Sequence, residues 1–125
     1  MSSRIGFWSA VPDGAKLRVS VTGTTKKTLV TAHPFVLRGD GVEQTFPDDQ
    51  IQPGPLEIDL EHPNTYSFFV DLVYTTSGKA DVTAEVVSGK KRIPPDGSDD
   101  TQFETTVAGS QGQTLGLTFF IVTTK

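Results

Sequence analysis

The chain has 125 residues, no cysteine and a formal net charge of −4. This length fits a single domain, residues 1–125, and the lack of cysteine excludes disulfides, thiolate metal sites and a thiol nucleophile. The excess of 15 acidic over 11 basic side chains disfavours nucleic acid as a partner, because that affinity depends on clustered Lys and Arg. No apolar window of about 18 residues predicts a membrane span, and the N-terminal residues lack the apolar stretch of a secretory signal.

Strand-forming and turn-forming residues dominate the composition. Thr (17) and Val (13) favour pleated strands, whereas the strong helix formers Ala (6) and Leu (8) are scarce. Gly (12) and Pro (8) punctuate the chain with turns. Nowhere do apolar residues recur at helical spacing over three turns. We therefore expect an all-β protein with no substantial helix.

About eight strands are predicted along the chain. In order, they are residues 5–8, 17–22, 28–32, 56–61, 66–74, 81–86, 103–107 and 115–122. Most alternate apolar and polar side chains, which is typical of a strand with one face on a core and one face in water. Turn residues separate the strands, so we expect an antiparallel β-sandwich of immunoglobulin-like or jelly-roll type. A closed barrel is the alternative.

Two local features predict how strands end. Residues 75–79 (Thr-Thr-Ser-Gly-Lys) link two strong strands and predict a tight hairpin. His33 and His62 each precede a proline, which pushes the preceding residue into an extended conformation. We expect both histidines at strand ends or turns, because neither has the spacing of a metal-ligating pair.

Two strands, 66–74 and 115–122, are apolar on both of their faces. Such strands are usually central and covered on both sides. Their second faces carry Phe69, Val73, Phe120 and Val122. If these side chains lie together on the outer face of one sheet, they predict the interface of a homo-oligomer. The alternative is that the N-terminal segment or the 39–55 connection covers them.

Two long connections, 39–55 and 88–100, are the first places to look for a site, because long loops in small domains are often functional. The second connection contains a cluster of oxygen-bearing side chains of the kind that calcium binds. Its candidate calcium ligands are Asp96, Ser98, Asp99 and Asp100. Asp48 and Asp49 of the first connection would join them if both loops share one end of the sandwich. The alternative is that Pro-Asp-Gly-Ser is turn chemistry and the acids only solvate the loop.

Aromatic side chains near loops suggest a ligand site of another kind. Sugar-binding sandwiches stack sugar rings on flat aromatic faces, and the candidates here are Trp8, Phe46, Tyr66 and Tyr74. Trp8 and Phe46, together with Asp48 and Asp49, form the predicted ligand-binding set. Burial of Trp8 in the core is the alternative.

The function expected from these features is recognition without catalysis: loops at one end would bind a carbohydrate or a protein, with calcium as the only candidate cofactor. The alternative is a structural subunit of capsid, tail or fibre type that assembles through the apolar sheet face. A small hydrolase is the second alternative. The sequence lacks the Gly-x-Ser-x-Gly motif of a nucleophilic serine, and we expect the carboxylates of the predicted strands to point into water. We therefore do not expect an enzyme.

Overall fold

The computed structural model describes residues 5–12, 14–22, 30–39, 41–46, 51, 55–60, 65–97 and 101–123. It is an all-β sandwich of two mostly antiparallel sheets, and the described residues contain no helix, as predicted. The strands are β1 (Ile5–Val11), β2 (Lys16–Thr22), β3 (Val30–Arg38), β4 (Glu43–Thr45), β5 (Leu56–Asp59), β6 (Thr65–Tyr74), β7 (Gly78–Ser88), β8 (Lys91–Ile93), β9 (Phe103–Gly109) and β10 (Thr114–Thr123).

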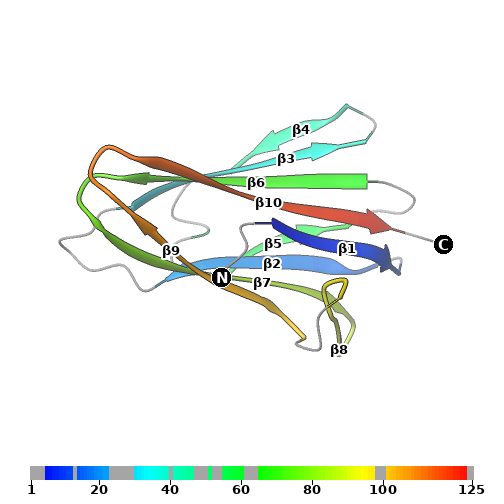
Figure 1. The fold of residues 1–125 in the computed structure, drawn as a ribbon. Helices are drawn as coiled ribbons and strands as arrows, with labels where there is room; N and C mark the ends of the chain where they lie inside the picture. Colours follow the sequence, from blue (N-terminus) through cyan, green and yellow to red (C-terminus); the bar gives the residue numbers. More distant parts are fainter. Residues whose placement is uncertain are drawn as a thin grey trace.

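The two sheets contain five strands each (Figure 1). Sheet A has the order β1-β10-β6-β3-β4, and its β1–β10 pair is parallel. Sheet B has the order β5-β2-β7, after which β8 and β9 share the far side of β7. β9 pairs with the first half of β7, from Gly78 to Ala84, and β8 with its end, from Val86 to Ser88. β1 and β4 are therefore the two edges of sheet A.

The prediction of a tight hairpin at residues 75–79 is wrong. β6 belongs to sheet A and β7 to sheet B, so this segment crosses between the sheets. The β9–β10 connection crosses beside it, with the Tyr74 N–H donating to the Gln113 carbonyl (2.9 Å) and the Gly112 N–H donating to the Tyr74 carbonyl (2.7 Å). A hairpin would need β6 and β7 to be neighbours, but both sides of each strand are taken by other strands.

The expectation that His33 ends a strand is also wrong, because β3 continues through Pro34 to Arg38. β4 pairs only with residues 35–37 of β3, so Pro34 lies where β3 has no second neighbour among the described strands. A proline is tolerated in such an edge position, since the missing N–H breaks no ladder bond there. His62 lies outside the described residues. The strand count exceeds eight because the long connections contain the short strands β4 and β8.

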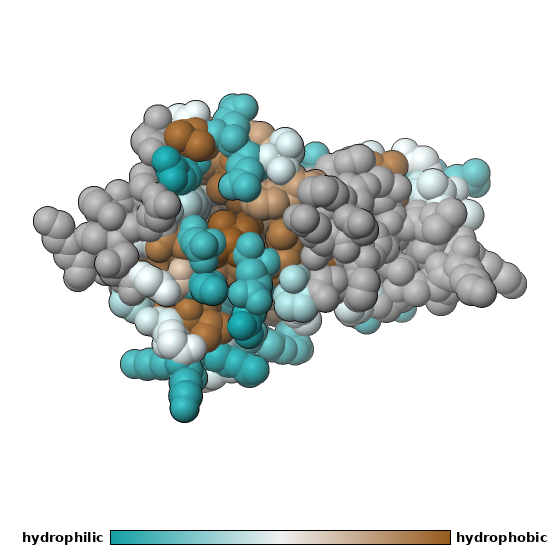
Figure 2. Space-filling model, turned by 180° about the vertical axis from the view of Figure 1, so that it is seen from behind, coloured by the Kyte–Doolittle hydropathy of each residue, from teal (hydrophilic) through white to brown (hydrophobic). Residues whose placement is uncertain are grey.

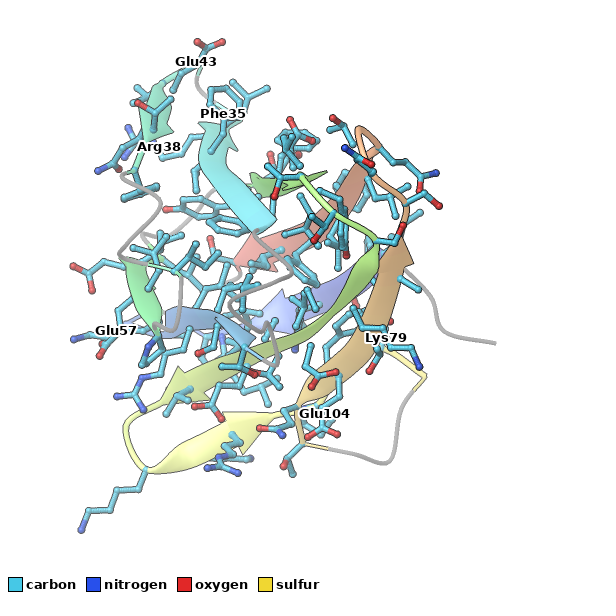
Figure 3. All side chains as sticks on the ribbon, turned by 90° about the vertical axis from the view of Figure 1, so that its left-hand side faces the viewer. Phe35, Arg38, Glu43, Glu57, Lys79 and Glu104 are labelled. Carbon is cyan, nitrogen blue, oxygen red and sulfur yellow. The ribbon has the colours of Figure 1, made fainter. Side chains whose placement is uncertain are left out.

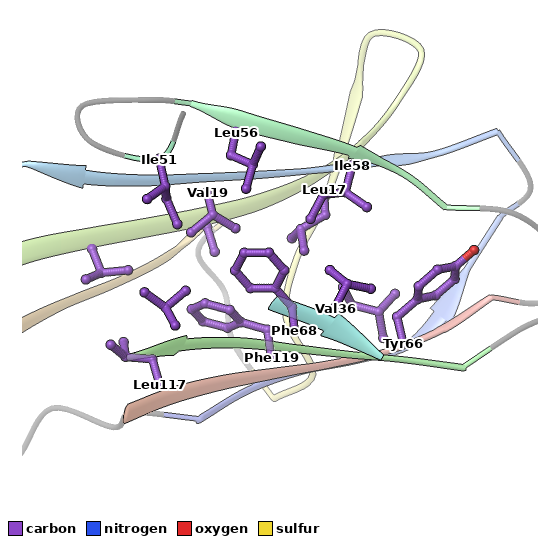
Figure 4. Packing of buried hydrophobic residues seen from close by; sticks show 14 of the residues in the cluster. Leu17, Val19, Val36, Ile51, Leu56, Ile58, Tyr66, Phe68, Leu117 and Phe119 are labelled. Carbon is purple, nitrogen blue, oxygen red and sulfur yellow. The ribbon is translucent and has the colours of Figure 1, made fainter. Parts of the chain in front are cut away.

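The core lies between the two sheets and is built from their inward side chains (Figure 4). Trp8, Phe68 and Phe119 are fully buried at its centre. The Phe119 ring lies 6.0 Å from Trp8 and 6.2 Å from Phe68, and meets Phe103 of β9 edge-on at 5.2 Å. Phe119 therefore joins the two sheets at the point where β1, β6, β9 and β10 converge.

Tyr74 closes the core beside the two crossing connections and provides a pH-dependent test of the packing. It is fully buried, its hydroxyl donates to the Val107 carbonyl at 2.5 Å, and burial raises the pKa of the phenol above its usual value of 10.0. Folding therefore favours the neutral phenol, so its stabilisation is complete below about pH 10 and is lost as pH rises further.

We expect Tyr74→Phe to be less stable than the wild type by about 0.5–1.5 kcal/mol at pH 8, because the hydrogen bond is lost. Above pH 10 this difference should shrink by about 1.4 kcal/mol per pH unit, since only the wild type then unfolds to an ionised Tyr74. Urea unfolding at pH 8 and pH 11 measures both values. A difference that does not change with pH would contradict the expected burial of the phenol.

Candidate functional site

The outer face of sheet B is covered with charged side chains. Arg18 on β2 lies 3.7 Å from Glu57 on β5 and 3.7 Å from Glu85 on β7. Arg92 on β8 lies 3.1 Å from Glu85, and Lys16 extends the row to Glu57 at 3.9 Å. Apart from Glu85, which is 16% exposed, these side chains are exposed. Exposed ion pairs contribute little stability, but they are typical of a face that remains in water.

The outer face of sheet A is apolar and aromatic instead. We call it the aromatic face and define it by the large outward side chains of four strands. These are Ile5, Phe7, Phe35, Leu37, Phe69, Val73, Phe120 and Val122. Among the side chains that the structure describes on this face, only Asp71 and Glu43 are charged. Figure 3 shows Phe35 and Glu43 on this side of the molecule, with Glu57 and Glu104 on the opposite sheet.

Strand register brings the largest side chains of the aromatic face into two adjacent rows across the sheet. The first row contains Phe7, Phe120, Ser67 and Leu37. The second row contains Ile5, Thr118, Phe69 and Phe35. The rings of Phe7 and Phe120 lie 6.2 Å apart, and those of Phe35 and Phe69 lie 5.9 Å apart. Both distances are typical of interacting aromatic pairs, so the face carries two ring pairs in adjacent rows.

No described segment crosses the aromatic face (Figure 1). Ile5 is 59% and Phe7 43% exposed, and the other members are half-buried against one another. The described part of the β4–β5 connection runs to sheet B instead, where Ile51 is fully buried and its carbonyl accepts a hydrogen bond from the Val21 N–H at 2.8 Å. The described part of the β4–β5 connection therefore does not cover the aromatic face.

All four residues predicted for an interface lie on the aromatic face. They are Phe69, Val73, Phe120 and Val122. The prediction did not include Phe7 and Phe35, which complete the two ring pairs. The alternation of Phe35 and Leu37 around the buried Val36 is a signal for this face, but Pro34 had indicated that the strand ended earlier.

The two described members of the predicted ligand-binding set, Trp8 and Phe46, are not brought together. Trp8 is fully buried, and its indole N–H donates to the Ile93 carbonyl at 3.0 Å, so the ring presents no face to a ligand. Trp8 lies in β1 and Phe46 follows β4, and these strands are opposite edges of sheet A. Phe46 is half-buried against the core. Asp48 and Asp49 lie outside the described residues.

Asp96, predicted as a calcium ligand, contacts the edge of β1. Its backbone N–H donates to the Phe7 carbonyl at 2.7 Å, and its carboxylate accepts a hydrogen bond from the Ser9 N–H at 3.2 Å. These bonds satisfy backbone groups that an edge strand would otherwise offer to another chain. The remaining predicted ligands, Ser98, Asp99 and Asp100, lie outside the described residues. Within the described ranges, no group of three His, Cys, Asp or Glu residues is placed to hold a metal ion.

The part of the chain that the structure describes includes no helix long and apolar enough to cross a membrane. Comparison of the chain with known protein families, with curated proteins and with solved structures gives no match. The function is therefore inferred from the two outer faces and the edges of the sandwich themselves.

Proposed function

We propose that this protein is a structural subunit that self-associates by packing the aromatic face of one copy against the aromatic face of a second copy. The contrast between the two outer faces carries the proposal: charged side chains in ion pairs cover sheet B, and phenylalanines cover sheet A. Monomeric proteins rarely leave a contiguous apolar surface of this kind in water. Burial against another chain removes it from water and stabilises the pair.

The flat area of the aromatic face approaches the area that each partner of a stable dimer buries. β6 and β10 are paired over nine residues, from Thr114 to Val122, which corresponds to a length of about 30 Å. Four strands carry the face, so its width is about 20 Å and its area about 600 Å² before side-chain relief is counted. Stable interfaces bury about 800 Å² per partner, and aromatic residues are enriched at their centres.

A second copy suits this face better than an unrelated partner, because an apolar surface with few charges is complementary to itself about a two-fold axis. Asp71 lies in the row of Gly116, just beyond the row of Phe69. A two-fold axis that lies in the plane of the interface and runs perpendicular to the strands reverses position along the strands. It therefore places the two Asp71 carboxylates at opposite ends of the interface. This arrangement avoids like-charge repulsion, so it is the dimer we expect.

Light scattering on the wild type and on Phe69→Asp and Phe120→Asp tests the proposal. We expect a wild-type mass of twice 13.5 kDa at high protein concentration, and 13.5 kDa for each variant. A carboxylate buried in the apolar interface would cost more than the contact provides. Ser20→Asp is the matched control on the outer face of sheet B and should leave the dimer intact.

Circular dichroism shows whether each variant keeps its strands, and Phe120→Ser replaces any variant that does not fold. Folded variants that retain the doubled mass would contradict the proposal. A wild type that is monomeric at every concentration would contradict it as well.

A further inference from the structure

A cleft of about 280 Å³ lies on the side of the sandwich opposite β1, where β3 and β4 of sheet A face β5 of sheet B. Its polar and aromatic lining consists of Arg38, Gln44, Phe46, Glu57, Asp59 and Tyr66. Figure 2 shows this side of the molecule, with brown apolar residues visible between teal hydrophilic ones. None of these residues belongs to the aromatic face.

The strand pattern explains why polar side chains line this cleft. Arg38 and Gln44 occupy inward positions of β3 and β4, in phase with Val36, but they lie beyond the edge of the core. Ile58 and Tyr66 are buried and contribute the apolar floor. In Figure 3 Arg38 and Glu57 lie on the same side of the molecule, one from each sheet. The two walls thus come from different sheets and meet over an apolar base.

The chemistry of this lining matches a ligand with several hydroxyl groups. Guanidinium, amide and carboxylate groups are planar and can bind two neighbouring hydroxyls at once. Phe46 is half-buried, so part of its ring remains available to the C–H face of a sugar. Glu57 and Asp59 each lie 3.9 Å from the Lys16 ammonium, and Glu57 also lies 3.7 Å from the Arg18 guanidinium. All three distances exceed hydrogen-bond length, so carboxylate lone pairs remain for hydroxyl donors.

We infer that this cleft binds one or two rings of a neutral carbohydrate. In the lining itself Glu57 and Asp59 outnumber Arg38, because Lys16 and Arg18, which pair with these carboxylates, lie outside it; we expect this to disfavour an anionic sugar. The volume of about 280 Å³ falls just below the range typical of ligand pockets, about 300–1,000 Å³, which limits the ligand to a mono- or disaccharide unit. In the proposed dimer the two clefts would lie outside the interface, so a multivalent glycan would gain affinity from both.

The test is titration of the full ¹⁵N-labelled chain with neutral hexoses and disaccharides, followed by NMR. We expect shifts confined to the cleft, including the side-chain amide of Gln44, and about tenfold weaker binding for Gln44→Ala and for Phe46→Ala. Glu104→Ala, on sheet B away from the cleft, is the control and should bind like the wild type.

Three results would overturn the inference: no shifts with any neutral sugar of the panel, shifts unchanged by Gln44→Ala and Phe46→Ala, or tighter binding of glucuronate than of glucose. Repeating the titration with monomeric Phe120→Asp separates this site from self-association. Sugar shifts that persist in that variant support the cleft whatever the outcome for the dimer.

Discussion

Phe119→Ala should lower the free energy of unfolding by about 3–5 kcal/mol. Phe119 is fully buried and packs against the rings of Trp8, Phe68 and Phe103, so truncation leaves a cavity that three fixed rings cannot fill. Urea unfolding followed by the fluorescence of Trp8, the only tryptophan, reports the loss at the same place in the core.

Phe120→Ala is the matched control, because Phe120 is the next residue of β10 and lies on the aromatic face. At protein concentrations low enough to keep the chain monomeric, we expect it to cost less than about 1.5 kcal/mol, since a half-buried ring loses less apolar contact. Equal losses for the two variants would mean that the two faces of sheet A are not differently buried.

Gly109→Ala should destabilise the protein by about 2–3 kcal/mol through overpacking. A Cβ atom at Gly109 would lie 2.6 Å from Cε1 of the Tyr74 ring, far inside van der Waals contact. The ring has no room to retreat, because it is fully buried and its hydroxyl is held by the Val107 carbonyl. Thermal or urea unfolding measures the effect.

Gly116→Ala is the control for that substitution, because it also lies inside a strand but its Cβ would meet only the exposed Asp71 carboxylate, at 3.3 Å. We expect a change within about 0.5 kcal/mol there. If Gly109→Ala is as well tolerated as Gly116→Ala, this result would contradict the close contact between Gly109 of β9 and the Tyr74 ring.

Alternation along the chain was enough to predict the sandwich, because it records which face of each strand is buried. It does not record which strand lies beside which. The strands now called β6 and β7 follow one another closely and look like a hairpin, yet each is surrounded by strands from elsewhere in the chain. β3 was predicted too short for a different reason: Pro34 indicates a strand end unless it is known that β4 pairs only with residues 35–37.

Because alternation does not show which strands are neighbours, only part of the candidate sites could be predicted from the sequence. Phe69 and Phe120 were found because each belongs to a strand that is apolar on both faces. Phe7 could not be assigned, since only its register with Phe120 places its ring outside and Trp8 inside. The cleft was not predictable as a whole, because its two walls come from different sheets. The sequence suggested only its aromatic members Phe46 and Tyr66, as candidates to stack on a sugar.

Asp96 illustrates how a local pattern can serve a role that only the fold reveals. Calcium binding by Asp96 stays a prediction; in the fold its carboxylate accepts a hydrogen bond from the Ser9 N–H of β1, and its own N–H donates to the Phe7 carbonyl. Because these two backbone groups of β1 are already bonded, addition of a strand at this place is disfavoured, which is consistent with the proposed association through the aromatic face.

Hydroxyl-radical footprinting of the unmodified protein at low and high concentration tests the proposed association most directly. We predict that oxidation of Phe69 and Phe120 falls several-fold at the concentration where the mass doubles, because both side chains become buried between two copies. Phe46, in the cleft on another side of the sandwich, should be oxidised equally at both concentrations. A doubled mass with unchanged oxidation of Phe69 and Phe120 would contradict the aromatic face as the contact surface.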